Sequence, residues 1–156
     1  MLRLFISDLH LSEETPEIEQ AFYEFLRREC KAESLIILGD LFEVWVGDDD
    51  DAAQPCRVKE KLLTLSRAGW EVLLLPGNRD FMLGHCFARE VGGKLLEEES
   101  VVEVCGLPTL LMHGDTLCTD DVEYQSFREM VHSPGWKTEA MKKSLVQRRS
   151  LARQIR

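Results

Sequence analysis

Five side chains that can bind a metal ion stand at the ends of short apolar runs in this sequence. They are Asp8, His10, Asp40, Asn78 and His113. Two carboxylates, two imidazoles and an amide oxygen form a hard-to-borderline ligand set, which suits Mn, Fe, Mg or Zn better than copper. The set is large enough for two ions bridged by Asp40, and paired ions about 3.5 to 4 Å apart commonly serve displacement at phosphorus. The residue types therefore indicate metal-assisted phosphoester chemistry.

The apolar runs in front of these residues are short and lack a helical period, so they predict strands. They cover residues 4–6, 35–38, 72–75 and 110–112. Side chains two positions apart on a strand point the same way, so Asp8 and His10 can aim at one point. Taken singly, such a residue is more typical of a turn or a cap. Because ligands of open α/β sheets lie beyond the carboxyl ends of the strands, we expect the four endings to converge on one site.

The residues between the strands predict helices over 15–30, 55–69 and 82–91, and a helical C-terminal part from Asp121 on, broken at Pro134. Thr15 is expected to cap the first helix, whose buried stripe is Ile18, Phe22, Phe25 and Leu26. A strand, a helix and a strand within about 40 residues form a parallel unit with a right-handed crossover. Residues 101–105 and 109–112 predict an antiparallel hairpin. The fold class is therefore α/β, with two sheets or one mixed sheet.

Length and composition indicate one globular domain. The chain has 156 residues, of which 44% are hydrophobic. No stretch approaches the roughly 18 apolar residues of a membrane span, and the first apolar run is too short for a signal sequence, so we expect a cytosolic protein. The five cysteines contain no C-x-x-C pair and are expected to be reduced and mostly buried. They are Cys30, Cys56, Cys86, Cys105 and Cys118.

The net charge of −9 is unevenly distributed. No acidic residue follows Glu139, and the basic residues there are Lys142, Lys143, Arg148, Arg149, Arg153 and Arg156. On one helix Met141, Leu145, Ala152 and Ile155 would share a face, opposite a basic face of Lys142, Arg149, Arg153 and Arg156. Such a helix suits an anionic membrane or lipid, and the alternatives are packing on the acidic body or solvation. The aspartates 48–51 are expected either to be solvated or to attract the metal.

In order and spacing, Asp8-x-His10, Gly39-Asp40, Gly77-Asn78 and His113 resemble the first four blocks of the calcineurin-like metallophosphoesterases. The resemblance implies a two-sheet sandwich flanked by helices (αββα), with a core over 1–121 and the beginning of a helical lid over 122–156. It also implies two divalent ions, manganese by preference. One ion would be held by Asp8, His10 and Asp40, and the other by Asp40, Asn78 and His113.

Three longer stretches are similar to the branch of this family that cleaves UDP-2,3-diacylglucosamine in bacterial lipid A synthesis. They cover residues 39–49, 77–81 and 113–121. This resemblance implies attack of metal-activated water on the α-phosphorus, giving UMP and 2,3-diacylglucosamine 1-phosphate. The catalytic residues would be Asp40, Asn78, Arg79 and His113, and the substrate contacts Asn78, Arg79 and Asp121. We also expect peripheral contact with the cytoplasmic face of the anionic inner membrane, no obligate protein partner, and no nucleic acid, which the acidic body would repel.

Two departures from the family pattern qualify this expectation. Arg79 replaces the histidine that most members use as a proton donor. A sugar phosphate leaves readily without a proton, and a guanidinium can stabilise it, whereas the alternative for Arg79 is a surface ion pair with Asp80. The family's closing Gly-His-x-His block has no match, and His85 and His132 lie in the wrong context to replace it. We therefore expect a fragment that lacks its last third, with an inactive fragment, another dinuclear phosphoesterase or a non-catalytic scaffold as alternatives.

Overall fold

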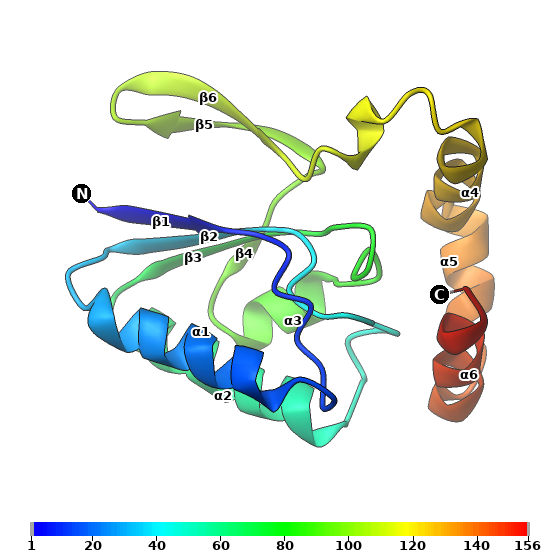
Figure 1. The fold of residues 1–156 in the computed structure, drawn as a ribbon, viewed down its shortest axis with the longest axis horizontal. Coiled ribbons are helices and arrows are strands. Elements are labelled where there is room, and N and C mark those ends of the chain that lie inside the picture. The colour runs from blue at the N-terminus through cyan, green and yellow to red at the C-terminus, as the bar shows by residue number, and fades with distance from the viewer. Residues whose placement is uncertain (1, 156) are drawn as a thin grey trace.

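The computed structural model describes residues 2–155, without the side chain of Ile155 (Figure 1). Its elements in chain order are β1 (Arg3–Ile6), α1 (Pro16–Arg28), β2 (Ser34–Leu38), α2 (Ala53–Arg67), β3 (Glu71–Leu75), α3 (His85–Glu90), β4 (Lys94–Leu95), β5 (Glu99–Val104), β6 (Leu107–Met112), a 3₁₀ turn (Asp115–Leu117), α4 (Val122–His132), α5 (Pro134–Met141) and α6 (Leu145–Ile155). The alternation of strands and helices up to β4 builds the parallel units that the apolar runs predict.

The strands form two sheets, as the resemblance implies. The first sheet is parallel, in the order β1-β2-β3-β4, and the second is the antiparallel hairpin of β5 and β6. The hairpin turns at Cys105 and Gly106, both of which have positive φ, as a two-residue turn requires. Figure 1 shows α1, α2 and α3 on one face of the parallel sheet and the hairpin on the other. The α/β sandwich with flanking helices is confirmed.

The central strands are apolar throughout because both of their faces are covered. Leu35 and Ile37 of β2 face the core that the sheet shares with α1, α2 and α3, while Ile36 packs towards the hairpin with Leu111. The outer face of the hairpin is exposed, as Val101 shows with 68% of its surface accessible. The alternation along each strand thus places one core on each side of the parallel sheet.

The described residues correct several local expectations. The Thr15 side chain does not cap α1, because its hydroxyl lies 2.9 Å from that of Ser12 instead. Ile18 is 37% exposed and lies outside the buried stripe. The third helix begins at His85 rather than at residue 82, and β4 was not predicted. All five cysteines are free, as expected, but exposed rather than buried.

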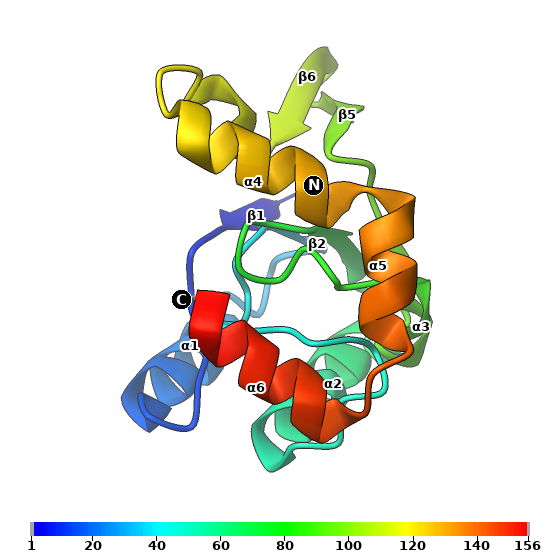
Figure 2. The same ribbon diagram turned by 90° about the vertical axis from the view of Figure 1, so that its right-hand side faces the viewer.

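The C-terminal helices do not form the single amphipathic helix that the charge pattern suggested. The helix α5 ends at Met141 and α6 begins at Leu145, so these two residues do not share a helical face. The side chain of Ile155 and all of Arg156 lie outside the described residues. Figure 2 shows α4, α5 and α6 following one another across the side of the molecule at which the parallel strands end. Within residues 2–155, no helix is long and apolar enough to cross a membrane.

Candidate active site

The strand-end residues converge where the sequence placed them. One ligand atom each of Asp8, His10 and Asp40 lies within 4.8 Å of the other two. Asn78 and His113 join them from the ends of β3 and β6, since His113 Nε2 lies 3.7 Å from Asp40 Oδ1 and 2.8 Å from Asn78 Oδ1. All five residues of the expected ligand set therefore meet at the carboxyl edge of the parallel sheet.

An unusual backbone aims these side chains. Asp8, His10 and Asp40 all have positive φ, at 55°, 48° and 53°. Residues without glycine's freedom take this left-handed conformation at a cost of about 1–3 kcal/mol each, mostly at functional sites. The two loops support each other, because His10 N donates to Asp40 O at 3.0 Å and Leu11 N donates to Leu41 O at 3.0 Å. Hydrogen bonds between the loops thus hold the ligands in a strained but fixed arrangement.

Two glycines let the loops approach so closely. A Cβ on Gly77 would lie 2.2 Å from Asp40 Oδ1, and one on Gly39 would lie 2.5 Å from His113 Nδ1. Gly39 also has a φ of +91°, which side chains disfavour. The glycines of the Gly-Asp and Gly-Asn blocks are therefore required by the packing of the site itself.

Asp40 lies at the centre of the site and is only 2% exposed. Its Oδ2 lies 3.5 Å from His10 Nε2, and its Oδ1 lies 3.7 Å from His113 Nε2 and accepts the backbone N–H of Arg79 at 2.8 Å. Burial raises the pKa of the Asp40 carboxyl, against the opposing effects of the Arg79 hydrogen bond and the two histidines. A carboxylate that offers one oxygen to each histidine has the arrangement of a bridging ligand.

The hydrogen bonds of His113 indicate whether a cation fits beside Asp40 and Asn78. His113 Nδ1 lies 2.8 Å from the Leu38 carbonyl oxygen, which can only accept, so the proton of the neutral ring is on Nδ1. His113 Nε2 then points a lone pair at Asn78 Oδ1, another acceptor, 2.8 Å away. Two acceptors at this distance repel each other unless a proton lies between them or both coordinate one cation beside them. The donor set therefore fits a divalent ion at this position.

The buried carboxylate of Asp80 connects the loops that follow β2 and β3. It is 1% exposed and accepts four backbone N–H groups, from Gly77 and Asp40 on Oδ1 and from Leu41 and Phe42 on Oδ2. Burial raises the pKa of Asp80 to about 6, although these hydrogen bonds favour the charged form. A surface ion pair of Asp80 with Arg79 is therefore wrong, because the carboxylate is turned into the protein.

Arg79 faces a different carboxylate. Its Nη1 lies 3.9 Å from Glu43 Oε1, and its side chain is 39% exposed. This long and partly solvated pair leaves the guanidinium fork available to a ligand. The other oxygen of Glu43, Oε2, lies 2.7 Å from His10 Nδ1. Glu43 is thus a site residue that sequence reasoning did not single out.

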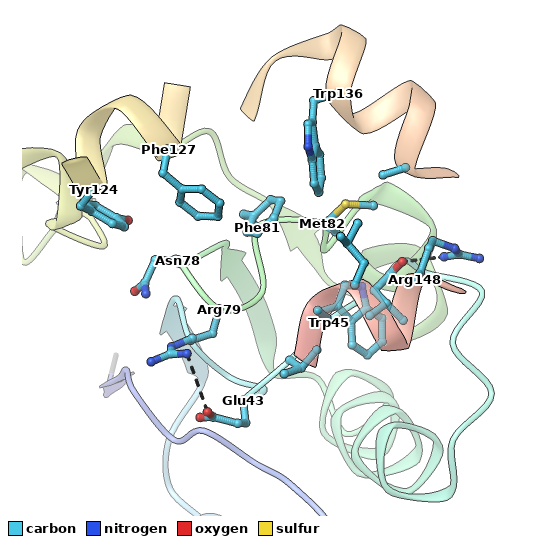
Figure 3. A pocket seen from close by; sticks show the side chains of 15 residues that line it. Glu43, Trp45, Asn78, Arg79, Phe81, Met82, Tyr124, Phe127, Trp136 and Arg148 are labelled. Atoms are coloured by element: carbon cyan, nitrogen blue, oxygen red, sulfur yellow. Dashed lines mark hydrogen bonds and ion pairs between the residues drawn. The ribbon is translucent and has the colours of Figure 1, made fainter. Parts of the chain in front are cut away.

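A cavity of about 310 Å³ opens beside Asn78 and Arg79 (Figure 3). Its size lies in the range of small-molecule sites. Its walls are largely apolar and come from the segments after β2 and β3 and from all three C-terminal helices. The residues around it are Glu43, Val44, Trp45, Val46, Asn78, Arg79, Phe81, Met82, Tyr124, Phe127, Trp136, Ala140, Arg148, Leu151 and Ala152. Sequence reasoning missed the aromatic wall, because its members are far apart in the chain.

The acidic loop after β2 holds α6 against this cavity. Arg148 is 5% exposed and donates to the Val46 carbonyl and to both oxygens of Asp49. A Cβ on Gly47 would lie 2.5 Å from Arg148 Nη1, so the glycine makes room for the guanidinium. Arg149 pairs with Asp50 and Asp51. Packing on the acidic body therefore describes these two arginines, and they do not face outwards towards a membrane.

The remaining polar residues of interest have local partners. Asp121 caps α4 by accepting the Tyr124 N–H at 3.0 Å and does not line the cavity described above. Asp48 accepts the backbone N–H groups of Gly84 and Phe87 and thereby fixes the start of α3, so it is not simply solvated. His85 is exposed on α3, and His132 stacks on Phe81 and pairs with Glu98.

Comparison with known proteins assigns the fold to a family. The profile described as calcineurin-like phosphoesterase matches residues 1–152. Three proteins named UDP-2,3-diacylglucosamine hydrolase align with the whole chain over 157 residues. The one from Cellvibrio japonicus is 46% identical, the one from Escherichia coli 48% and the one from Hahella chejuensis 44%. The chain spans 65%, 65% and 64% of their lengths, respectively.

Proposed function

This chain belongs to the calcineurin-like phosphoesterase family, and we propose that it serves the hydrolysis of UDP-2,3-diacylglucosamine to UMP and 2,3-diacylglucosamine 1-phosphate in lipid A synthesis. The observation that carries the proposal is the apolar cavity that opens beside Asn78 and Arg79. A substrate of this class has fatty acyl chains next to a diphosphate. The cavity offers an apolar wall to the chains and a polar edge to the phosphates.

Proteins of this family use divalent metal ions, and the five converging residues are the groups that would hold them here. Asp8, His10 and Asp40 would bind one ion, and Asp40, Asn78 and His113 the second. Manganese is our choice among the metals that accept oxygen and imidazole ligands. When bound, such ions neutralise charge on phosphoryl oxygens and lower the pKa of water, which supplies the nucleophile for attack on the α-phosphorus.

The protein residues position the diphosphate. Arg79 and Asn78 line the cavity beside the ligand set, where they can donate to the phosphate that leaves with the sugar. The leaving group has a second pKa of about 6 and needs charge stabilisation rather than a proton, which a guanidinium provides through its fork. Asp121, as the cap of α4, would contribute by holding Tyr124 at the cavity wall and would reach the substrate only after a local rearrangement.

Residues 122–156 would act as the beginning of the lid over the acyl chains, and residues 1–121 as the phosphoesterase core. Each of α4, α5 and α6 gives apolar side chains to the cavity, for example Phe127, Trp136 and Leu151. Several ion pairs join the two parts, among them those of Arg128 with Asp115 and Glu98 and that of Arg148 with Asp49. These contacts support a lid that is docked on the core.

We also propose peripheral contact with the cytoplasmic face of an anionic membrane. Lys143 and Arg153 are exposed on the C-terminal segment, which also carries the apolar Val146, 75% exposed. Each cation near an anionic surface contributes about 1 kcal/mol, and less at high salt. Co-sedimentation with anionic vesicles should fall when both residues are changed to Gln. Binding that this change leaves intact would refute the contact.

Another dinuclear phosphoesterase, such as a nucleotide diesterase or a phosphatase, is the second candidate, and a non-catalytic scaffold is the third. A compact, polar nucleotide would leave most of the apolar cavity unused. The scaffold would not require three strained residues that meet at one point. Both observations favour the acylated diphosphate.

The test combines binding with turnover. The chain is loaded with Mn²⁺, and binding of 2,3-diacylglucosamine 1-phosphate is followed by the fluorescence of Trp45 and Trp136, which line the cavity. UMP release from UDP-2,3-diacylglucosamine is measured in parallel. Ala152→Phe, which fills the cavity, should abolish binding, whereas the matched control Ala68→Phe on the exposed end of α2 should not. If the chain neither binds the acylated product nor releases UMP, the proposal is refuted.

A further inference from the structure

Glu43 lies between two residues of the candidate site, and the proposed function gives it no role. Its side chain is 17% exposed, and its two oxygens face two different functional residues. Oε2 lies 2.7 Å from His10 Nδ1, and Oε1 lies 3.9 Å from Arg79 Nη1. Figure 3 shows Glu43 below Arg79 at the edge of the cavity. The first contact is a full hydrogen bond, whereas the second is a loose ion pair.

The backbone places this carboxylate with little freedom. Glu43 N donates to Leu11 O at 3.1 Å, and Leu11 forms a parallel bridge with Phe42, which is 1% exposed. Leu11, the residue after His10, is therefore fixed to the same loop that carries Glu43. A side chain in such a position can orient its partner without reorganising first.

We propose that Glu43 is a positioning residue that acts through His10. By accepting the Nδ1–H, it holds the imidazole in the tautomer whose Nε2 lone pair points towards Asp8 and Asp40, which lie 3.8 and 3.5 Å away. A carboxylate behind a histidine fixes the ring and makes it a stronger metal ligand. The loose contact with Arg79 is a secondary consequence of the same position. This inference rests on the proposed function for the identity of the metal site.

The tautomer can be measured without any metal. In the metal-free chain, ¹⁵N–¹H correlation spectra of the imidazoles should show His10 protonated on Nδ1. Glu43→Gln presents an amide that can turn its NH₂ group to the ring, so Nδ1 loses its obligatory acceptor and the Nε2–H form should appear. His85, exposed on α3, serves as an internal reference that should not change. An unchanged His10 tautomer in Glu43→Gln overturns the proposal.

Metal affinity gives the second readout. Free Mn²⁺ is measured by electron paramagnetic resonance during titration of the chain. Glu43→Gln should weaken binding by about 10–100-fold, the usual effect of removing such a partner. Glu43→Asp, which keeps the carboxylate, should restore part of the loss. Glu24→Gln is the matched control, because it removes the same charge from the exposed side of α1, where Glu24 pairs with Arg28.

A double-mutant cycle separates the two contacts of Glu43. In Arg79→Ala the effect of Glu43→Gln on Mn²⁺ affinity should persist in full. In His10→Ala, where Asp40, Asn78 and His113 would remain to hold an ion, the same change should have no further effect. The reverse pattern overturns action through His10. A wrong substrate assignment would give a different result. The chain would then bind Mn²⁺, and Glu43→Gln would weaken that binding as expected, but the acylated substrate would not be hydrolysed.

Discussion

Asp80→Asn is expected to destabilise the protein strongly, because it replaces a carboxylate with a group that has one acceptor oxygen. Oδ1 accepts from Gly77 and Asp40, and Oδ2 accepts from Leu41 and Phe42. The two shortest bonds, 2.7 Å from Gly77 and 2.8 Å from Leu41, lie on different oxygens. An amide must give up one of them whichever way it is turned, and its NH₂ group then faces two N–H donors.

The size of the effect follows from these contacts. Each buried N–H group left without an acceptor costs about 1–3 kcal/mol, so two such groups cost about 2–6 kcal/mol of unfolding free energy. Asp80→Ala leaves four donors and a cavity, and should cost more. Because whole domains are stable by only about 5–15 kcal/mol, we expect the alanine variant to be marginally folded.

Urea denaturation of the metal-free chain, followed by far-ultraviolet circular dichroism, measures this loss. Asp51→Asn is the control, because Asp51 has a side chain that is 77% exposed and pairs with Arg149 at the surface. Exposed pairs contribute at most about 1 kcal/mol. If Asp80→Asn loses no more stability than Asp51→Asn, the four contacts do not hold the loops, and the account of the preorganised site is wrong.

Three further outcomes are expected. Metal analysis after Mn²⁺ loading should find about two ions per chain. Asp40→Ala should lose more metal than any other single ligand change, because Asp40 faces both histidines. An unchanged metal stoichiometry in Asp40→Ala contradicts the bridge. Arg79→Lys should weaken binding of inorganic phosphate to the Mn²⁺-loaded chain by about tenfold, or about 1.4 kcal/mol. The charge is kept, but the forked hydrogen bonds of the guanidinium are lost. Wild-type phosphate affinity in Arg79→Ala would exclude Arg79 as a phosphate contact. Hydrogen bonding from Arg148 lowers the pKa of Asp49 below its usual 3.8. The stabilisation from this pair is therefore present above about pH 3.8 and is lost as the pH falls through the folded pKa, so Trp136 fluorescence should show an acid transition that Asp49→Asn abolishes.

The sequence was sufficient to predict that the side chains of the expected ligand set converge, because that information is local. Each member of the set follows a short apolar run. The runs before Asp8, Asp40 and Asn78 form parallel neighbours, with Ile6 opposite Ile37 and Leu38 opposite Leu75, whereas His113 follows β6 of the antiparallel hairpin. Parallel neighbours bring their carboxyl ends to one edge, so the meeting of Asp8 and Asp40 follows from topology alone.

The supporting residues could not be predicted, because their partners are backbone groups or distant residues. The sequence puts Asp80 beside Arg79 and so suggests an ion pair, but Asp80 instead satisfies N–H groups of two loops about 40 positions apart. The residue type of His10 favours positive φ only weakly, and hydrogen bonds to the neighbouring loop hold that conformation. Residue patterns predict which side chains converge, whereas long-range contacts decide how firmly they are held.

The charge pattern of the C-terminal segment left two arrangements open, a face towards lipid and packing on the acidic body, for a related reason. A helical wheel treats basic residues as a face exposed to water or lipid, yet Arg148 is buried against the acidic loop. The loop's own acidic run is the feature that could have indicated this partner. Opposite charges in two segments of one chain favour contact between them before contact with any external surface.

The two attachments of the C-terminal helices differ in a way that bears on entry to the cavity. At the α4 end, Arg128 and Asp115 form a hydrogen-bonded pair in which both side chains are 14% exposed. At the α6 end, Arg148 is 5% exposed, but its partner Asp49 is 53% exposed. Separating the α4 pair would require water to reach both charges, whereas water already reaches the α6 pair on one side. Since Leu151 and Ala152 line the cavity from α6, opening at this end would uncover the apolar wall while α4 keeps its place beside His113.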